Sequence, residues 1–255
     1  MIIIGLGTGR SGTASLAKLL NAQRDAICFH EMNPSCMRWS GTPRPAVNMV
    51  EEFEAILDGG PTDRLTVDLS RRVAAEAYAQ LTAMPKARLL GDISFYYLNY
   101  VDDLLAVSDR GRFICLKRDK QQTVESWMRK SGLPRWPSKA LGERISAAVT
   151  RQPYHDSRNF WMDHDGTTWA PDPVWDKLFP KFQADNKRSA IEQYWDFYYQ
   201  EAEKIAARLP EYVRIVRTED LDDRSFQSEL LTFCGVPTNE QVPTDAHIHK
   251  SQQAS

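Results

Sequence analysis

The first 20 residues constrain the fold more than any other segment, because they join a short apolar run to a glycine-rich loop and a helix. Ile2–Leu6 is apolar but too short for a buried helix, so it predicts a buried strand. Gly7-Thr8-Gly9-Arg10-Ser11-Gly12-Thr13 follows, and leucines at helical spacing then predict a helix over Thr13–Leu20. A strand, a glycine turn and a helix in this order are typical of an α/β protein with a parallel sheet.

Further apolar runs and helical patterns alternate along the rest of the chain. The additional predicted strands are Ala26–Phe29, Ala87–Leu90, Arg112–Leu116 and Val213–Val216. The predicted helices between them include Ala46–Leu57, Leu69–Met84 and Asn186–Leu209. This alternation predicts a parallel sheet covered on both faces, with ligands bound beyond the carboxyl ends of the strands.

Length and charge exclude several classes of protein. A chain of 255 residues fits one α/β domain of ordinary size, or two small ones. With 32 basic and 34 acidic side chains the net charge is −2, so any attraction to an anion must be local. No apolar stretch approaches the roughly 20 residues that span a bilayer, and the opening MIIIGL is too short for a signal peptide. We therefore expect a cytoplasmic protein with no membrane span and no nucleic-acid partner.

The four cysteines, Cys28, Cys36, Cys115 and Cys234, are too sparse for a disulfide scaffold and form no C-x-x-C pair. We expect buried thiols in a reducing compartment, and neither a structural zinc site nor any other metal.

One region breaks the alternation of strands and helices. Ser131–Asp185 is rich in proline and has little clean periodicity, so we interpret it as an insertion or lid within a single domain over residues 1–255. Residues 154–199 carry 12 of the chain's 26 aromatic residues. Trp161, Trp169 and Trp175 alternate there with polar side chains, a pattern that suits stacking on an acceptor molecule, although core packing explains it equally well. The polar side chains are His155, Asp156, Arg158, Asp163, His164 and Asp165.

The loop after the first strand has the composition of an anion site. Its glycines allow a tight turn in which backbone N–H groups converge, and the helix that follows adds partial positive charge at its N-terminus. Arg10 adds a full charge, and Ser11, Thr13 and Ser15 add hydroxyl donors. These residues predict a phosphate or sulfate site, with a glycine turn that only packs helix on strand as the alternative.

The spacing of the glycines leaves the kind of anion open. Gly7-x-Gly9-x-x-Gly12 fits the dinucleotide fingerprint, and Glu31, 19 residues beyond Gly12, lies near where a ribose-binding acid is expected. An NAD(P)-dependent oxidoreductase is therefore one alternative, and a non-catalytic nucleotide-binding module is another. The loop of nucleoside triphosphatases does not match, because it requires Lys where this chain has Thr13.

The segment GTGRSGTASL resembles the 5′-phosphosulfate loop of sulfotransferases that use 3′-phosphoadenosine 5′-phosphosulfate (PAPS), most closely in the style of carbohydrate and bacterial sulfotransferases. Arg118, at the end of the fourth strand, and Ser126, eight residues later, resemble the pair that binds the 3′-phosphate in that family. The segments Gly91–Leu98, Val216–Leu221 and Phe233–Pro237 are also similar to parts of the family.

The resemblance implies a P-loop NTPase-like, three-layer α/β fold with a five-stranded parallel sheet. It implies transfer of a sulfuryl group from PAPS to the hydroxyl of a carbohydrate or another small molecule. The residues implied in donor binding are Gly9, Arg10, Ser11, Gly12, Thr13, Ser15, Arg118 and Ser126.

Three acid–base candidates follow from strand ends and from the resemblance. Glu31 occupies the place of the base in the carbohydrate branch of the family, and His30 is its rival because His titrates near neutrality. Only one of the two can point into the cleft from an alternating strand end. Asp92 orients the acceptor or holds Arg10, unless it is a helix cap or a solvated acid. Arg10 stabilises the leaving phosphate oxygen, and since Arg stays charged it is a poor proton donor.

A last cluster, His247, His249 and Lys250, lies near the C-terminus. The resemblance implies a loop that closes over the nucleotide, and the alternatives for these residues are a metal site or a mobile polar tail.

Overall fold

The computed structural model describes residues 1–33, 41–132, 141–142, 145, 148–149, 161–169, 171–172 and 175–245. Its centre is a five-stranded sheet with the strand order β2-β3-β1-β4-β5, in which each pair of neighbouring strands runs parallel. The strands are β1 (Ile2–Leu6), β2 (Ala26–His30), β3 (Leu89–Ile93), β4 (Gly111–Lys117) and β5 (Val213–Arg217). The predicted class, a P-loop NTPase-like α/β fold with a five-stranded parallel sheet, is confirmed.

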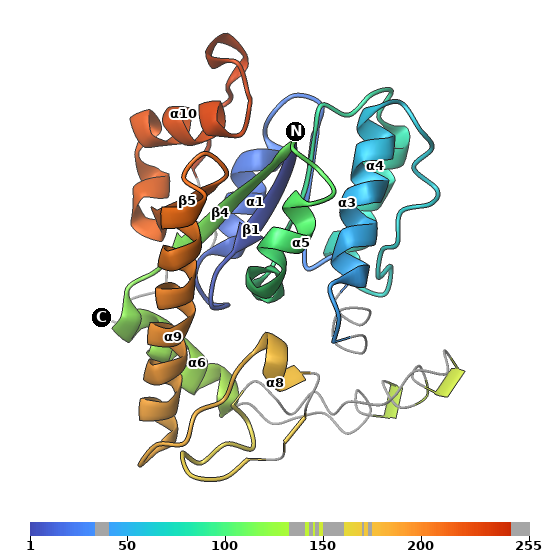
Figure 1. Ribbon diagram of the computed structural model, residues 1–255. Helices are drawn as coiled ribbons and strands as arrows, with labels where there is room; N and C mark the ends of the chain where they lie inside the picture. The colour runs from blue at the N-terminus through green and yellow to red at the C-terminus, as the bar shows by residue number, and fades with distance from the viewer. Residues whose placement is uncertain are drawn as a thin grey trace.

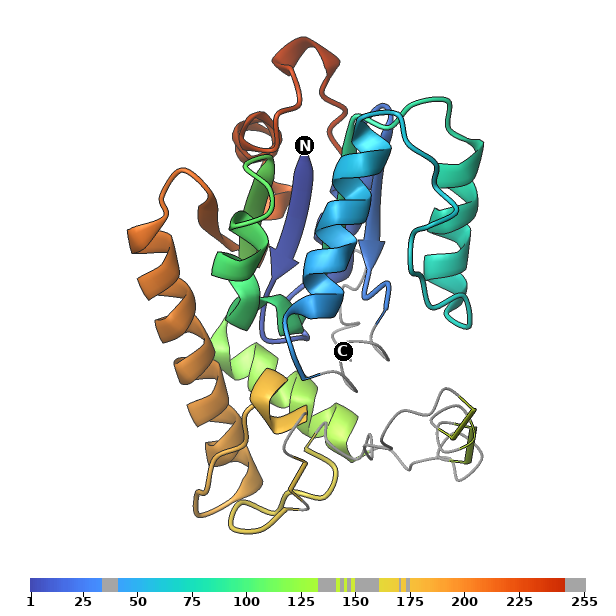
Figure 2. The ribbon, with the colours of Figure 1, turned by 45° about the vertical axis from the view of Figure 1, so that its right-hand side comes forward.

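Helices cover both faces of the sheet, as Figures 1 and 2 show. Alternating side chains of β1 explain this arrangement, since Ile2 and Ile4 enter one apolar cluster and Ile3 enters the other. The cluster of Ile3 is built with α1 (Thr13–Asn21) and α10 (Arg224–Phe233). The opposite cluster is built with α3 (Arg44–Leu57), α5 (Val101–Leu105), α6 (Lys120–Ser131), α8 (Trp175–Leu178) and α9 (Lys187–Arg208).

The remaining helices complete the outline. Helix α4 (Arg72–Ala83) contacts β2 at the edge of the sheet. Short 3₁₀ helices cover Phe95–Tyr100, Thr218–Asp222 and Thr238–Glu240.

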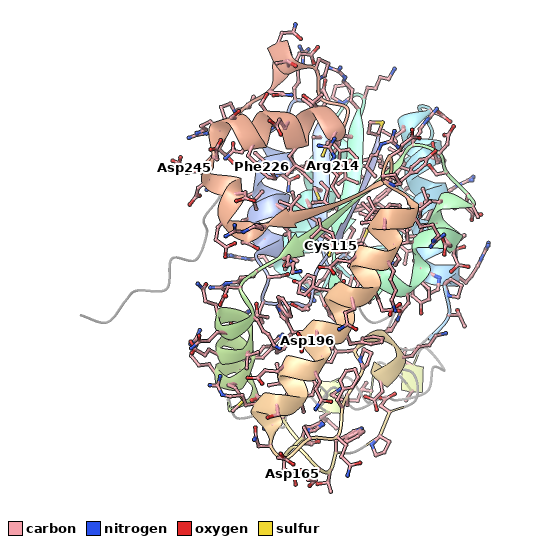
Figure 3. The ribbon with its side chains drawn as sticks, turned by 60° about the vertical axis from the view of Figure 1, so that its left-hand side comes forward. Cys115, Asp165, Asp196, Arg214, Phe226 and Asp245 are labelled. Atoms are coloured by element: carbon pink, nitrogen blue, oxygen red, sulfur yellow. The ribbon has the colours of Figure 1, made fainter. Side chains whose placement is uncertain are left out.

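The helices α6 and α9 begin at side-chain caps that the sequence makes available. Asp119 accepts a hydrogen bond from the Gln122 amide at the start of α6, and Asn186 accepts one from the Ser189 amide at the start of α9. Helix α9 has 22 residues and runs past Asp196 toward the sheet, where Cys115 lies in β4 (Figure 3). Its place beside β4 brings a helix far along the chain next to the glycine loop.

The third strand lies further along the chain than the sequence predicts. Ala87–Leu90 was expected, whereas β3 covers Leu89–Ile93. Gly91 and Asp92 have low strand propensity, so the apolar pattern stops too early, but pairing with β1 and β2 carries the strand through them. Asp92 is therefore inside the strand and not beyond its end.

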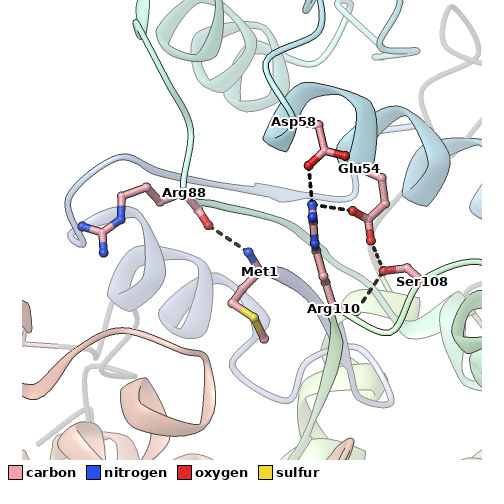
Figure 4. Close-up of polar contacts among 6 residues, drawn as sticks. All are labelled: Met1, Glu54, Asp58, Arg88, Ser108 and Arg110. Carbon is pink, nitrogen blue, oxygen red and sulfur yellow. Dashed lines mark hydrogen bonds and ion pairs between the residues drawn. The ribbon is translucent and has the colours of Figure 1, made fainter.

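The amino ends of the strands are fastened by polar contacts away from the carboxyl edge (Figure 4). The Arg110 guanidinium, just before β4, donates to Glu54 of α3 at 2.8 Å and to Asp58, the C-cap residue of that helix, at 2.9 Å. The Met1 ammonium donates to the Arg88 carbonyl at 2.9 Å. In Figure 1 the strands run downward from this edge, so their carboxyl ends face α6 and α8.

Three of the four cysteines lie among the described residues, and all three are free, buried thiols as predicted. Burial raises the pKa of Cys28, Cys115 and Cys234, so these thiols stay protonated. Cys36 lies outside the described residues.

The close packing of β3 on β1 leads to a prediction. A Cβ atom at Gly91 would lie 2.3 Å from the Ile3 carbonyl oxygen, whereas one at Gly111 would meet its nearest neighbours at ordinary contact distance. We expect Gly91→Ala to lower the free energy of unfolding by about 1–3 kcal/mol, because the β1 backbone must move. Gly111→Ala is the matched control and should stay within about 0.5 kcal/mol of the native chain. Equal loss in the two variants on denaturant unfolding would contradict this account of the packing.

Candidate functional site

The glycine loop between β1 and α1 needs glycine at two places, because each has a positive φ and lies against a side chain that a Cβ would meet. Gly9 has φ 71°, and a Cβ there would lie 2.7 Å from the Trp127 ring. Gly12 has φ 89°, and a Cβ there would lie 2.4 Å from Thr218 Cγ2. Gly12 also precedes α1 and has no side chain to cap it, so no capping side chain occupies the N–H groups at the start of the helix.

Arg10 adopts the left-handed backbone conformation without being glycine, with φ 61°. For a residue with a Cβ this conformation costs about 1–2 kcal/mol, so the surrounding structure must hold it.

Three buried tyrosine hydroxyls on α9 hold the loop and the end of β4. Tyr198 accepts from the Gly7 amide and donates to the Phe95 carbonyl, which joins the loop to the first residue of the 3₁₀ helix after β3. Burial raises the pKa of all three phenols, so they remain donors at physiological pH. The contacts to the loop and β4 are Tyr198 Oη to Gly7 N at 2.8 Å, Tyr194 Oη to Thr8 O at 3.2 Å and Tyr199 Oη to Leu116 O at 2.6 Å.

Arg10, Arg118 and Ser126 come together although more than 100 residues separate Arg10 from the other two. Arg10 Nε donates to Ser126 Oγ at 2.9 Å, and Arg118 Nη1 donates to the Arg10 carbonyl at 3.2 Å. Burial lowers the pKa of Arg10, and the positive charges of Arg118 and Arg129 lower it further. Crowded guanidinium groups repel one another, and a bound anion relieves that repulsion.

Two hydroxyl groups in this region fit an anionic ligand. Ser126 accepts a hydrogen bond from Arg10, which leaves its own hydrogen to donate. Ser11 is buried, and its hydroxyl has no hydrogen-bond partner among the described residues. A phosphate or sulfate oxygen is a suitable acceptor for both. Ser15, the third serine of the predicted set, is buried in the first turn of α1.

The two rival bases at the end of β2 have different surroundings. His30 Nε2 lies 2.9 Å from Thr13 Oγ1, so the imidazole contacts the anion loop. Burial lowers the pKa of His30, which is then neutral at pH 7. Glu31, with 28% of its side chain exposed, pairs through Oε2 with Arg71 Nη2 at 2.8 Å. Of the two, Glu31 is the one that forms an ion pair at the carboxyl edge of the sheet.

Asp92 is fully buried in β3, which excludes the alternatives of a solvated acid and a helix cap. Its carboxylate accepts hydrogen bonds from the Tyr97 hydroxyl and, at 3.2 Å, from the Met32 amide. Burial raises its pKa to about 6 against the opposing effect of these hydrogen bonds. Of the two functional roles expected for Asp92, orienting the acceptor or holding Arg10, the second is not observed, since Arg10 hydrogen bonds Ser126 instead.

The aromatic residues Trp161 and Phe179 of the insertion belong to the core, which for these residues favours core packing over stacking on an acceptor. Trp161 and Phe179 are buried and pack against Tyr194 of α9 and Trp127 of α6. Trp169 stacks on the buried His164 ring, with 4.8 Å between ring centroids and 5° between the planes. The side chain of Trp175 and all of His155, Asp156, Arg158, His247, His249 and Lys250 lie outside the described residues.

Two charged residues at the site were missed in the sequence. Arg129 follows Ser126 by three positions on α6, so helical periodicity could have placed it on the same side. Arg71 precedes α4 by one residue, and nothing in the local sequence relates it to Glu31.

A sequence model of the sulfotransferase family matches residues 2–186, so the chain belongs to the sulfotransferase family. Similar solved structures include a sulfotransferase domain from the curacin biosynthetic pathway, 16% identical over 98% of this chain and 80% of that one, with a TM-score of 0.46. A sulfotransferase from Alicyclobacillus acidocaldarius is 14% identical over 98% of this chain and 86% of its own, with a TM-score of 0.45. No curated protein sequence matches the chain.

Family and topology together correct the dinucleotide alternative. In the dinucleotide-binding fold the order 3-2-1-4-5-6 places β2 next to β1, whereas here β3 lies between them. Glu31 is thus one strand further from the glycine loop than a ribose-binding acid requires.

Across the described ranges, no helix is both long and apolar enough to cross a bilayer.

The raised pKa of Asp92 leads to a prediction on stability. The pKa of Asp92 is 3.8 in the unfolded chain and about 6 in the folded protein, so the folded protein binds the proton more tightly. The contribution of this proton to the free energy of unfolding is complete below about pH 4 and is lost as the pH rises through 6. The loss between pH 3 and pH 8 amounts to about 3 kcal/mol. Asp92→Asn removes the titration, so the stability of the native chain relative to this variant should fall by that amount over this range. A difference that does not change with pH, measured by urea unfolding, would contradict the assignment.

Proposed function

We propose that the protein transfers a sulfuryl group from PAPS to a hydroxyl acceptor. The observation that carries the proposal is the meeting of Arg10, Arg118 and Ser126 beside a glycine loop at the carboxyl edge of the sheet. A donor with phosphates at two positions suits two neighbouring sets of anion ligands. In this arrangement Arg118 and Ser126 bind part of the donor, whereas an NAD(P) site assigns no ligand to them.

The residues present fit this donor. Gly9, Ser11, Gly12, Thr13 and Ser15 belong to the loop and first helical turn that would hold the 5′-phosphosulfate, and the buried hydroxyl of Ser11 lacks a partner in the described chain. Arg118 and Ser126 would hold the 3′-phosphate. When bound, the donor supplies the sulfuryl group that passes to the acceptor oxygen.

Arg10 and Glu31 divide the catalytic work in this proposal. Arg10 neutralises negative charge on the leaving phosphate oxygen and, being permanently charged, does not protonate it. Glu31 takes the proton from the acceptor hydroxyl as that oxygen forms its bond to sulfur. His30 is less suited to be the base, because its Nε2 contacts Thr13.

The proposal for the acceptor-binding region is based on the amino-acid sequence. We propose a single domain over residues 1–255, in which residues 131–185 contact a carbohydrate or another small hydroxyl compound. A cytoplasmic location is part of the same proposal.

Donor binding tests the proposal most directly. We expect adenosine 3′,5′-bisphosphate to bind the full chain in calorimetry, and Arg118→Ala to weaken binding by about 10- to 100-fold, because charge-assisted hydrogen bonds to phosphate are lost. The matched control is Arg208→Ala, since Arg208 pairs with Asp102 on the surface. Uptake of NADH in place of the bisphosphate would overturn the proposed donor.

The identity of the base is tested by paired substitutions. We expect Glu31→Gln to slow release of the bisphosphate from PAPS, assayed with a panel of hydroxyl acceptors, by about 10²- to 10⁴-fold, while bisphosphate affinity is kept. His30→Gln should have a smaller effect, exerted through Thr13. The reverse order of effects would make His30 the base, and full activity in both would show that neither residue removes the proton.

A further inference from the structure

Asp92 is a buried carboxylate that the proposed mechanism does not use. Its hydrogen-bond donors in the described part of the chain are the Tyr97 hydroxyl, the Met32 amide and, at 3.5 Å, the Tyr96 hydroxyl. None of these groups carries a positive charge. A buried acid without a cation is costly to keep, and an apolar side chain would serve simple packing better. The hydrogen bonds that Asp92 accepts therefore explain its presence in the core better than packing does.

The segment that Asp92 holds is the turn after β2. Strand pairing places Phe29 opposite Asp92 and His30 opposite Ile93, and the Glu31 amide continues the ladder by donating to the Ile93 carbonyl at 3.2 Å. Glu31 then adopts a left-handed φ of 56°, which is unfavourable for a residue with a Cβ. The next amide has left the ladder, and the Asp92 side chain supplies its acceptor.

Met32 is held on its other side as well. Its carbonyl accepts a hydrogen bond of 2.7 Å from the Asp68 amide, in the segment before α4. The same segment leads to Arg71, which pairs with the Glu31 carboxylate at 2.8 Å. The backbone that carries Glu31 is thus fixed from the sheet by Asp92 and from the neighbouring loop by Asp68.

We propose that Asp92 is a positioning residue, whose carboxylate holds the Met32 amide and thereby fixes Glu31 at the carboxyl end of β2, where it pairs with Arg71. The catalytic consequence rests on the proposed function, in which Glu31 is the base. The structural part does not, because it concerns only the turn after β2.

Three variants separate this role from packing. Asp92→Ala removes the acceptor, whereas Asp92→Asn keeps an oxygen of similar placement and should restore most of the effect. Tyr100→Phe is the control. Tyr100 is a buried tyrosine of the 3₁₀ helix that also carries Tyr97, and its hydroxyl has no hydrogen-bond partner in the described chain. Should Asp92→Ala fail to fold, Tyr97→Phe replaces it, because it releases the carboxylate that holds Met32.

The first measurement is hydrogen exchange of the Met32 amide by NMR in the full chain. We expect Asp92→Ala to accelerate this exchange by about tenfold or more, with the change confined to residues near the turn, while Asp92→Asn and Tyr100→Phe stay close to the native rate. Unchanged exchange in Asp92→Ala would overturn the proposal. Faster exchange throughout the sheet, with no rescue by Asp92→Asn, would assign the residue to packing and overturn it too.

The second measurement is turnover of PAPS by the same variants. We expect kcat to fall by about 10- to 100-fold in Asp92→Ala, with the KM for PAPS and the affinity for adenosine 3′,5′-bisphosphate unchanged. Native turnover in a variant with accelerated exchange would overturn the catalytic consequence. If the native chain binds no bisphosphate, the proposed function fails, while the exchange measurement still decides whether Asp92 holds the turn.

Discussion

The hydrogen bonds from the tyrosines of α9 to the glycine loop are the interaction on which the site depends. The loop combines left-handed residues with backbone groups that leave the β ladder, so its N–H and C=O groups need partners from elsewhere. Buried phenols need partners as well. Tyr198 and Tyr194 satisfy both needs, since their hydroxyls bond the amide of Gly7 and the carbonyl of Thr8. The geometry of the anion loop is therefore set by a helix some 190 residues further along the chain.

The electrostatics of the site depend on this rigid backbone. The chain as a whole carries a net charge of −2, yet Arg10 lies close enough to Arg118 and Arg129 for their charges to lower its pKa, in addition to the effect of burial. Such crowding destabilises the unliganded protein, and an anion that binds the folded state returns the lost stability by linkage. Under the proposed function, anion binding and local order are therefore coupled at this edge of the sheet.

Most of the sheet and the anion loop could be predicted from the sequence, because their signals are local. Ile2–Leu6 and the loop after it are contiguous, and Ser126 of α6 follows Arg118 by eight residues. The end of β3 was misplaced because Gly91 and Asp92 are poor strand formers that pairing overrides. The pairing of Glu31 with Arg71 spans 40 residues and has no periodicity that could reveal it.

The aromatic residues near the insertion show how packing joins the two halves of the site. Trp161 and Phe179 lie in one cluster with Trp127, which is also the side chain that a Cβ at Gly9 would meet. The segment expected to face the acceptor therefore packs on the same tryptophan that a Cβ at Gly9 of the glycine loop would meet. Because close-packed interiors transmit small displacements, a change of volume at Phe179 should be felt at Gly9 before it alters any exposed surface.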